Sequence, residues 1–359
     1  HITARPTTSS LPRTTSPTLW QMRENSSAKV GRSEAGGSTN GGSSSDGGAS
    51  KSRAALVADG LRSLDGGGIL ALDVGGTKLA AGVVDGSGAI VAAAMCPTPA
   101  HDGPDAMWGA IAALFDDVRA TAGLEVIAVG CGSGGPMRGG DDVSPLNIPA
   151  WRHEPVATVL AELAGAPAWV DNDAKALTLA EGWRGAAVGV EDYLAMVVST
   201  GVGGGIVSGG RLLDGAAGNA GHIGHVIVEP DGRLCGCGAR GCLEAEASGT
   251  AVRAITGADP AVASPEVRRR VGTLVGRAVA SVANLLDLQL ACVAGSVALG
   301  YAEEFFSAAQ AEVDACARLS FSVGTRVVPA GCGPDGPLLG AAAVALSSMA
   351  DMGRGGSPG

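Results

Sequence analysis

The pattern of hydrophobic and polar positions changes abruptly near residue 68. Ser, Thr, Gly, Arg and Pro dominate the chain before that point, and the stretch 36–50 offers no apolar face. Such a composition buries too little apolar surface to fold, so we expect residues 1–67 to be a disordered leader without a catalytic role. At Ile69 the sequence becomes Ile-Leu-Ala-Leu-Asp-Val, a run typical of a buried strand.

A strand, a glycine turn and a second strand occur twice. The first copy joins the strand at Ile69 through Gly75 and Gly76 to an apolar run at 79–84. About 125 residues later, a strand at 193–199 leads through the glycine-rich loop 200–205 into a short strand at 205–208. Two hairpins with polar, glycine-rich tips predict a duplicated fold with one phosphate-facing loop in each half.

The rest of the chain alternates helical and extended patterns, which predicts an α/β protein with mixed sheets. After Glu244 the pattern is mostly helical, and the last ten residues are expected to fray. The predicted elements are helices at 106–121, 153–164, 265–286 and 338–349, and strands at 126–131, 168–170 and 291–295.

Composition and charge exclude several classes of protein. The 58 glycines among 359 residues show no triplet period, which excludes collagen. A formal charge of -10 argues against binding to nucleic acid. The chain has neither a membrane-length apolar run nor a secretion signal, so we expect a cytoplasmic protein without a membrane partner. Its eight cysteines are then thiols or metal ligands rather than disulfides.

Both glycine loops carry the groups that a phosphate site uses. The segment 73–78, Asp-Val-Gly-Gly-Thr-Lys, offers a carboxylate, a close backbone approach, a hydroxyl and a cation. It lacks the spacing of a P-loop or of a dinucleotide fold, and a tight hairpin with a surface lysine explains it equally well. The segment 199–205 is a stronger signal, because three successive glycines cost backbone entropy that a plain hairpin does not require.

One histidine and three cysteines have the spacing of a metal site. His225, Cys235, Cys237 and Cys242 are interleaved with glycines that let the chain turn tightly. One imidazole and three thiolates complete a tetrahedral zinc site, so the ion is predicted to be structural; the alternative is a chance cluster of reduced cysteines. The remaining cysteines are expected to be packing residues, namely Cys96, Cys131, Cys292, Cys316 and Cys332.

Carboxylates after the predicted strand at 168–170 suggest acid–base chemistry. Asp171 is interpreted as a helix N-cap. Asp173, next to Asn172 and near the glycine loops, is a candidate base for deprotonating a hydroxyl. Glu244 directly follows the cysteine cluster, where a lone exposed glutamate is the default interpretation.

The sequence from 69 to 349 resembles the ROK family of sugar kinases and sugar-responsive repressors. The most specific part is 221–244, GHIGHVIVEPDGRLCGCGARGCLE, which is similar to the family's ExGH and CxCGxxGCxE motifs. The resemblance implies a two-lobed, actin-like ATPase (ribonuclease H-like) α/β fold. A small lobe at 68–175, against which helix 337–349 packs, would precede a large lobe at 176–336 that carries the zinc loop 221–244, with a disordered tail at 350–359.

The same resemblance implies a role for each motif. Asp173 would be the general base of an ATP-dependent hexose 6-kinase, and Asp73 would help to place Mg2+ through water. The sugar would contact Asn147, Asn172, His222, His225 and Glu244, while zinc would bind His225, Cys235, Cys237 and Cys242. The nucleotide and its phosphates would contact Asp73, Gly75, Gly76, Thr77, Lys78, Thr200, Gly201, Gly203 and Gly295.

The sequence departs from the family pattern at two positions. His222 stands where the kinases usually have glutamate, so the set of sugar hydroxyls that is recognised can differ. Gly295 is followed by Ser296 instead of the second glycine of the adenosine motif, a mild change with which nucleotide binding is still expected. Glucose is the first candidate for the sugar substrate, with N-acetylmannosamine and kanosamine as alternatives. Polyphosphate is an alternative to ATP as phosphoryl donor. A DNA-binding repressor and an inactive zinc-stabilised scaffold are the rival classes. The resemblance also implies a homodimer or homotetramer.

Overall fold

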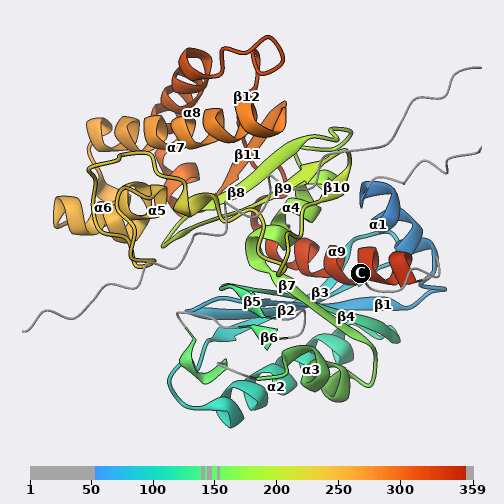
Figure 1. Ribbon diagram of the computed structural model, residues 1–359. Helices are drawn as coiled ribbons and strands as arrows, with labels where there is room; N and C mark the ends of the chain where they lie inside the picture. Colours follow the sequence, from blue (N-terminus) through green and yellow to red (C-terminus); the bar gives the residue numbers. More distant parts are fainter. Residues whose placement is uncertain (1–52, 139–141, 144–147, 152–153, 353–359) are drawn as a thin grey trace, which may run out of the picture. The chain divides into compact units, whose positions relative to one another are not determined.

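Two five-stranded sheets of the same topology organise the chain (Figure 1). The computed structural model describes residues 53–138, 142–143, 148–151 and 154–352. The first sheet has the order β3-β2-β1-β4-β7, formed by Ile90–Pro97, Lys78–Asp85, Gly68–Val74, Val126–Ser133 and Ala168–Asn172. The second has the order β10-β9-β8-β11-β12, formed by Arg211–Leu212, Val202–Ser208, Tyr193–Val198, Leu290–Ala294 and Arg326–Pro329. A small ribbon pairs β5 (Met137–Arg138) with β6 (Asp142–Val143).

The pairing pattern of the two sheets is identical. In each, an antiparallel meander of three strands (β1-β2-β3 and β8-β9-β10) is extended by two parallel strands (β4 and β7, β11 and β12). The repeat of topology confirms the predicted duplication. It also brings the turn between β1 and β2 and the turn between β8 and β9 to equivalent positions in the two halves.

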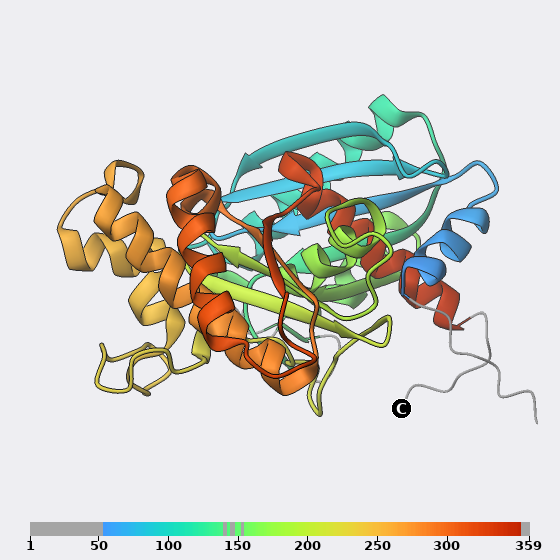
Figure 2. The ribbon, with the colours of Figure 1, turned by 90° about the horizontal axis from the view of Figure 1, so that it is seen from above.

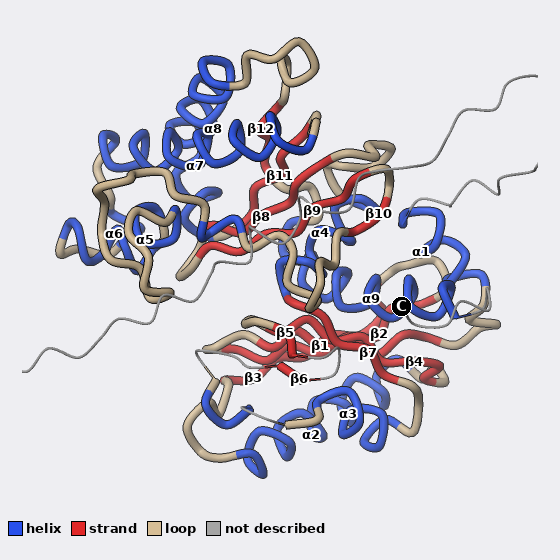
Figure 3. Tube along the Cα trace, viewed as in Figure 1, coloured by secondary structure: helices blue, strands red, loops and turns tan. Residues whose placement is uncertain are grey.

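Helices cover both faces of each sheet (Figures 2 and 3). Contacts place α2 and α3 on one face of the first sheet and α9 on the other, while α4 packs between α9 and strands β8 and β9. The pair α7 and α8 packs beside β11 and β12. The helix bounds are α1 Arg53–Arg62, α2 Pro104–Ala122, α3 Val156–Ala164, α4 Asp173–Arg184, α5 Leu243–Ala247, α6 Gly249–Thr256, α7 Pro265–Leu286, α8 Ser296–Cys316 and α9 Gly336–Met352.

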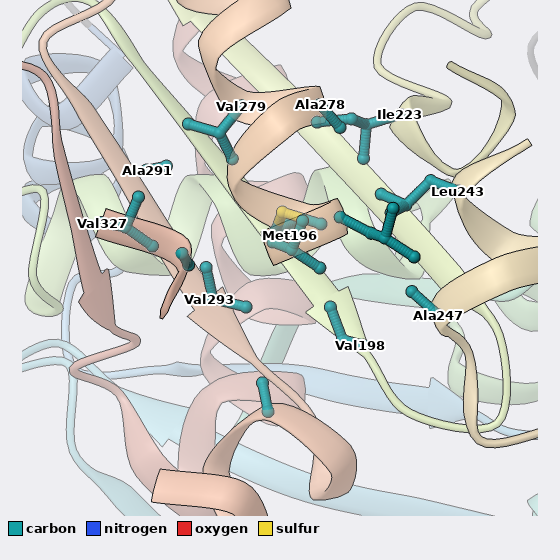
Figure 4. Packing of buried hydrophobic residues seen from close by; sticks show 14 of the residues in the cluster. Met196, Val198, Ile223, Leu243, Ala247, Ala278, Val279, Ala291, Val293 and Val327 are labelled. Atoms are coloured by element: carbon teal, nitrogen blue, oxygen red, sulfur yellow. The ribbon is translucent and has the colours of Figure 1, made fainter. Parts of the chain in front are cut away.

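Strand side chains alternate between separate cores, as the period of two in a strand requires. Along β1, Ile69 and Ala71 face the core shared with α4 and α9, whereas Leu70 and Leu72 face the core beneath α2 and α3. The third core lies between the second sheet and α7 and α8, and Figure 4 shows its members Met196, Val293 and Val279. Because both faces of β1 are buried, its sequence is a continuous apolar run rather than an alternating one.

Several expectations need correction at their boundaries. The leader was expected to run to residue 67, but α1 begins at Arg53, and Val57 and Leu64 are buried in the core shared with α9. The helix expected at 153–164 begins at Val156, and α9 continues through Met352 into the segment expected to fray. Cys316 is exposed rather than packed. Among the described residues, no helix is long and apolar enough to cross a membrane.

Candidate functional site

A cavity of about 670 Å3 lies where the two glycine hairpins, the start of α4 and the segment after β10 meet. Both hairpin tips contribute to its wall, together with the 3-10 turn η2 (Ile223–His225) and the first turn of α5. The cavity therefore gathers segments that are far apart in the chain. Predicted site residues in its lining are Gly75, Gly76, Asn172, Asp173, Thr200, Gly201, Gly203, His222, His225 and Glu244.

The other predicted site residues lie elsewhere. Thr77 and Lys78 are exposed at the tip of the first hairpin, outside the cavity lining. Gly295 has a φ of 100° at the start of α8, where a Cβ would collide with the backbone of Val198. It therefore serves the close approach of α8 to the second sheet. Asn147 lies outside the described residues.

The start of α4 is capped by Asn172, not by Asp171 as expected. The Asn172 side-chain oxygen accepts hydrogen bonds from the backbone of Ala174 (3.0 Å) and Lys175 (3.4 Å), while its amide nitrogen donates to the carbonyl of Gly135 (3.1 Å). Asp171 instead pairs with the Lys175 ammonium at 3.0 Å. Asn172 thus keeps one N–H for a ligand, and its oxygen is already used by the helix.

Asp173 is the first residue of α4, and its carboxylate faces the cavity. Its Oδ1 accepts a hydrogen bond from the backbone of Ala174 at 2.8 Å. A Cβ at Gly134 would lie 3.4 Å from its Oδ2, so the glycine leaves that oxygen open. Desolvation by the surrounding protein raises the pKa of Asp173. The result is a carboxylate whose basicity is increased at the point where a ligand can reach it.

A second carboxylate, Asp73 at the end of β1, is electrostatically coupled to the first. Desolvation, as the largest cause, and the charge of Asp173 together raise the pKa of Asp73 to about 7, against the opposing effect of Lys78. Two carboxylates close to one another in a desolvated site resist simultaneous ionisation unless a cation joins them. The pair is therefore a place where positive charge from a ligand is favoured.

The tip of the second hairpin is held by Glu244. Its Oε2 accepts a hydrogen bond from the backbone of Val202 at 2.9 Å, and a Cβ at Gly201 would lie 2.8 Å from the same oxygen. The backbone of Ser199 and Thr200 also accepts hydrogen bonds from Gly249 (2.7 Å) and from Thr250 (3.2 Å). Glu244 is thus half-buried and committed to the tip, which corrects the expectation of a lone exposed glutamate.

The three successive glycines of this hairpin lie in strand β9 rather than in its loop. A Cβ at Gly205 would come within 2.5 Å of Thr178 Oγ1 and 3.0 Å of Lys175 Cα, both on α4. A Cβ at Gly204 would meet Ile223 at 2.9 Å. The glycines therefore allow α4 and the turn η2 to pack directly on β9, a reason for their presence that the sequence alone did not reveal.

A further cavity of about 710 Å3 adjoins the second tip. Ser199 and Thr200 line both cavities, so the two spaces meet at this turn. The rest of the second lining comes from α6, the segment 259–261 and the first two turns of α8, including Arg253, Tyr301 and Ser296. A ligand in the second cavity can therefore reach the turn that also lines the cavity of Asp173.

The four predicted metal ligands converge beside the first cavity. The ligand atoms of His225, Cys235, Cys237 and Cys242 all lie within 4.8 Å of one another. His225 Nδ1 is 3.7 Å from Cys235 Sγ, and Cys237 Sγ is 3.7 Å from Cys242 Sγ. Tetrahedral zinc–sulfur bonds of about 2.3 Å separate ligand atoms by roughly 3.8 Å, so the cluster fits a Zn2+ ion with four protein ligands.

Two side chains in this region escaped the sequence interpretation. Asn219 lines the cavity and joins it to β5, because its Oδ1 accepts from the Met137 backbone at 2.8 Å and its Nδ2 donates to the Met137 carbonyl at 2.9 Å. Lys175 is buried among acidic and carbonyl oxygens. Asn219 could have been noticed in the sequence, because it lies in a glycine-rich stretch just before the motif Gly-His-Ile-Gly-His at 221–225. No sequence pattern indicated the role of Lys175.

His222 projects from the same segment into the cavity. Desolvation and the neighbouring His225 lower the pKa of His222, so the imidazole is neutral at pH 7. A neutral imidazole accepts one hydrogen bond and donates one, whereas a carboxylate only accepts. The side chain can therefore recognise a pair of ligand groups of mixed donor and acceptor character.

Comparisons with known proteins agree with this arrangement. The model of the ROK family matches residues 69–348. The N-acetylmannosamine kinase of Citrobacter koseri is 40% identical over 247 residues, covering 64% of this chain and 83% of that protein. Among solved structures, the ROK hexokinase from Thermus thermophilus has a TM-score of 0.69 with 34% identity over 79% of this chain and 99% of its own.

A Streptomyces griseus ROK family glucokinase, solved in complex with glucose and AMPPNP, has a TM-score of 0.67 and 30% identity. The similarity covers 78% of this chain and 99% of that one. Together with the duplicated sheet topology, these structural likenesses confirm the two-sheet, actin-like α/β fold expected from the sequence.

Proposed function

The chain belongs to the ROK family, and we propose that it is an ATP-dependent sugar kinase that phosphorylates the 6-hydroxyl of N-acetylmannosamine. One observation carries the proposal: the Asp173 carboxylate faces a cavity that meets a second cavity at Ser199 and Thr200. A sugar in the first cavity and a nucleotide in the second would bring the γ-phosphate to the shared turn. Phosphoryl transfer needs this positioning more than covalent chemistry from the protein.

Asp173 is assigned as the general base. Its free Oδ2 takes the proton of the sugar 6-hydroxyl while the hydroxyl oxygen forms a bond to the γ-phosphorus and the bond to the β-phosphate oxygen breaks, releasing ADP. A base works best when its pKa lies near the operating pH, and desolvation moves the pKa of Asp173 in that direction. The backbone N–H of Ala174 keeps the other carboxylate oxygen in place.

The remaining sugar contacts follow from which atoms are still free. Asn172 offers one amide N–H, because its oxygen caps α4. Glu244 offers its second oxygen, because Oε2 holds the hairpin tip. His222 and His225 supply imidazoles from the segment around η2. These groups would bind the ring hydroxyls and leave the 6-hydroxyl directed at Asp173.

Two metal ions are implied, and the donor sets fit both. Mg2+ would arrive with ATP and neutralise its phosphates; Asp73, raised in pKa by desolvation and by Asp173, would hold it through water. Zn2+ would bind His225 and the three cysteines as a structural ion. Cys242 is two residues from Glu244 and His225 lines the cavity, so this cluster fixes the direction of two sugar contacts.

The sugar is inferred from relatives and from His222. Curated relatives at 37% to 40% identity are N-acetylmannosamine kinases. Recognition of an acetamido group suits a neutral imidazole, since the amide presents both a donor and an acceptor. Glucose is the second candidate, because the solved structures of similar fold include a hexokinase and a glucokinase.

An assay for formation of the sugar 6-phosphate tests the proposal, because this product forms from either phosphoryl donor. N-acetylmannosamine, glucose and kanosamine are compared at equal concentration, each with ATP and with polyphosphate as donor, and Asp173→Asn serves as the inactive control. We expect the highest kcat/KM with N-acetylmannosamine and ATP. If glucose gave the highest kcat/KM, glucose would replace N-acetylmannosamine as the proposed substrate. Absence of sugar-dependent turnover would favour the scaffold or repressor class.

A further inference from the structure

Lys175 occupies an unusual position for a cation. It lies on α4 two residues after Asp173, and 3% of its surface is exposed. Its ammonium contacts Asp171 Oδ1 at 3.0 Å, Asp214 Oδ1 at 2.9 Å and the carbonyl of Gly218 at 3.2 Å. Three acceptors match the three N–H donors of an ammonium, so the group is fully satisfied.

The three acceptors belong to two parts of the chain. Asp171 is the penultimate residue of β7, two residues before α4, so this pair balances charge within one strand–helix unit. Asp214 and Gly218 belong to the segment 213–222, which follows β10 and ends at η2. That segment carries Asn219 and His222, whose side chains line the first cavity.

We propose that Lys175 is a positioning residue that fixes the segment 213–222 against the start of α4. The two contacts to this segment set the position of the cavity wall that carries His222 relative to the carboxylate of Asp173 on the same helix as Lys175. Asn219 fixes the segment on its other side, through Met137 of β5. The catalytic consequence of this role rests on the proposed function; the mechanical role does not.

Asp214, the exposed partner of Lys175, is the position where a substitution disturbs the fold least. Asp214 has a side chain that is 58% exposed, so Asp214→Asn removes the charge without leaving a buried cavity. Lys175 then keeps Asp171 as a counter-ion. Lys175→Met is the harsher variant, because it leaves Asp171 without its cation, and desolvation already raises the pKa of Asp171.

Steady-state kinetics give the first readout. We expect Asp214→Asn to raise the KM for the sugar about two- to fivefold, because the Asp214 side of this ion pair is exposed to solvent, with kcat within about twofold and the KM for ATP unchanged. The matched control is Asp192→Asn, because Asp192 accepts hydrogen bonds from Ser208 and Gly209 at the far end of β9. A general loss of stability would instead lower the active fraction and leave the KM for the sugar unaltered.

Amide hydrogen exchange of the ligand-free protein gives the second readout. In Asp214→Asn and in Lys175→Met, the amides of 213–222 should exchange faster than in the wild type, while those of β8 stay protected. Faster exchange in a protein that phosphorylates no sugar would support the positioning role and overturn the proposed function. Unchanged exchange together with an unchanged sugar KM, in an active kinase, would overturn the positioning role alone.

Discussion

Replacing Asp73 by asparagine should stabilise the protein at neutral pH while reducing its activity. In the folded protein the pKa of Asp73 is raised from 3.8 to about 7, mainly by desolvation and then by the charge of Asp173. The folded state therefore holds a proton that the unfolded state releases. Through this group, wild-type stability falls as pH rises from about 4 to about 7, and it stays at the lower level above that range.

The size of the effect follows from the two pKa values. A rise from 3.8 to about 7 corresponds to up to about 4 kcal/mol of destabilisation above pH 7. Asparagine does not titrate, so Asp73→Asn should have the wild-type stability near pH 4 and exceed it by an amount that grows toward pH 7. The activity should fall on the order of 10- to 100-fold, because the variant lacks the charge assigned to Mg2+.

Denaturant unfolding of both proteins at several values between pH 4 and pH 8 measures the difference. The control is Asp85→Asn at the turn after β2, where hydrogen bonds from Ser87 lower the pKa of Asp85. The expected change in stability has the opposite sign. Ionised Asp85 stabilises the fold at pH values above the pKa that this group has in the unfolded chain, so its replacement should lower the stability at neutral pH. A stability gain in Asp73→Asn that is the same at pH 4.5 and pH 8 would refute the reasoning.

Three further predictions concern the chemistry of the site. Asp173→Asn should lower kcat by about 10^2- to 10^4-fold while calorimetry still detects sugar binding, and a retained kcat would remove Asp173 as base. Cys237→Ser should lower the zinc content and Tm and raise the KM for the sugar; a zinc-free variant with wild-type Tm and KM would contradict the structural role of the ion. His222→Glu should change the ratio of kcat/KM between N-acetylmannosamine and glucose, and an identical ratio would show that His222 does not read the sugar.

The elements that carry local signals were predictable from the sequence. The continuous apolar run of β1 follows from burial on both faces, and the predicted α7 helix at 265–286 matches its observed bounds. The spacing of His225 and the three cysteines predicted that their ligand atoms would lie together, and they do. These features depend on residues close in sequence, where periodicity and spacing act directly.

Features that depend on contacts between distant segments were not predictable. Gly205 was assigned to a phosphate loop because the sequence shows only its neighbours along the chain. In the structure a glycine is needed there because Thr178 of α4 packs against it and leaves no room for a side chain. The cap of α4 is a local feature, but Asp171 and Asn172 both belong to residue types that cap helices well, so the sequence did not decide between them and the choice of Asp171 was wrong. The contact of Asn219 with Met137 joins residues 82 positions apart, which periodicity cannot detect.

Helix α4 connects these observations, because successive residues on it serve separate parts of the site. Asp173 faces the cavity, Lys175 holds the segment 213–222, and Thr178 lies against Gly205 of β9. Near its other end, buried Glu181 accepts hydrogen bonds from the backbone of Gly331 at 2.8 Å and of residue 332 at 2.9 Å, after β12. Asp173, the proposed base, thus lies on a helix that contacts the second sheet at several points, and the same helix holds the segment 213–222 that carries His222, a proposed sugar contact.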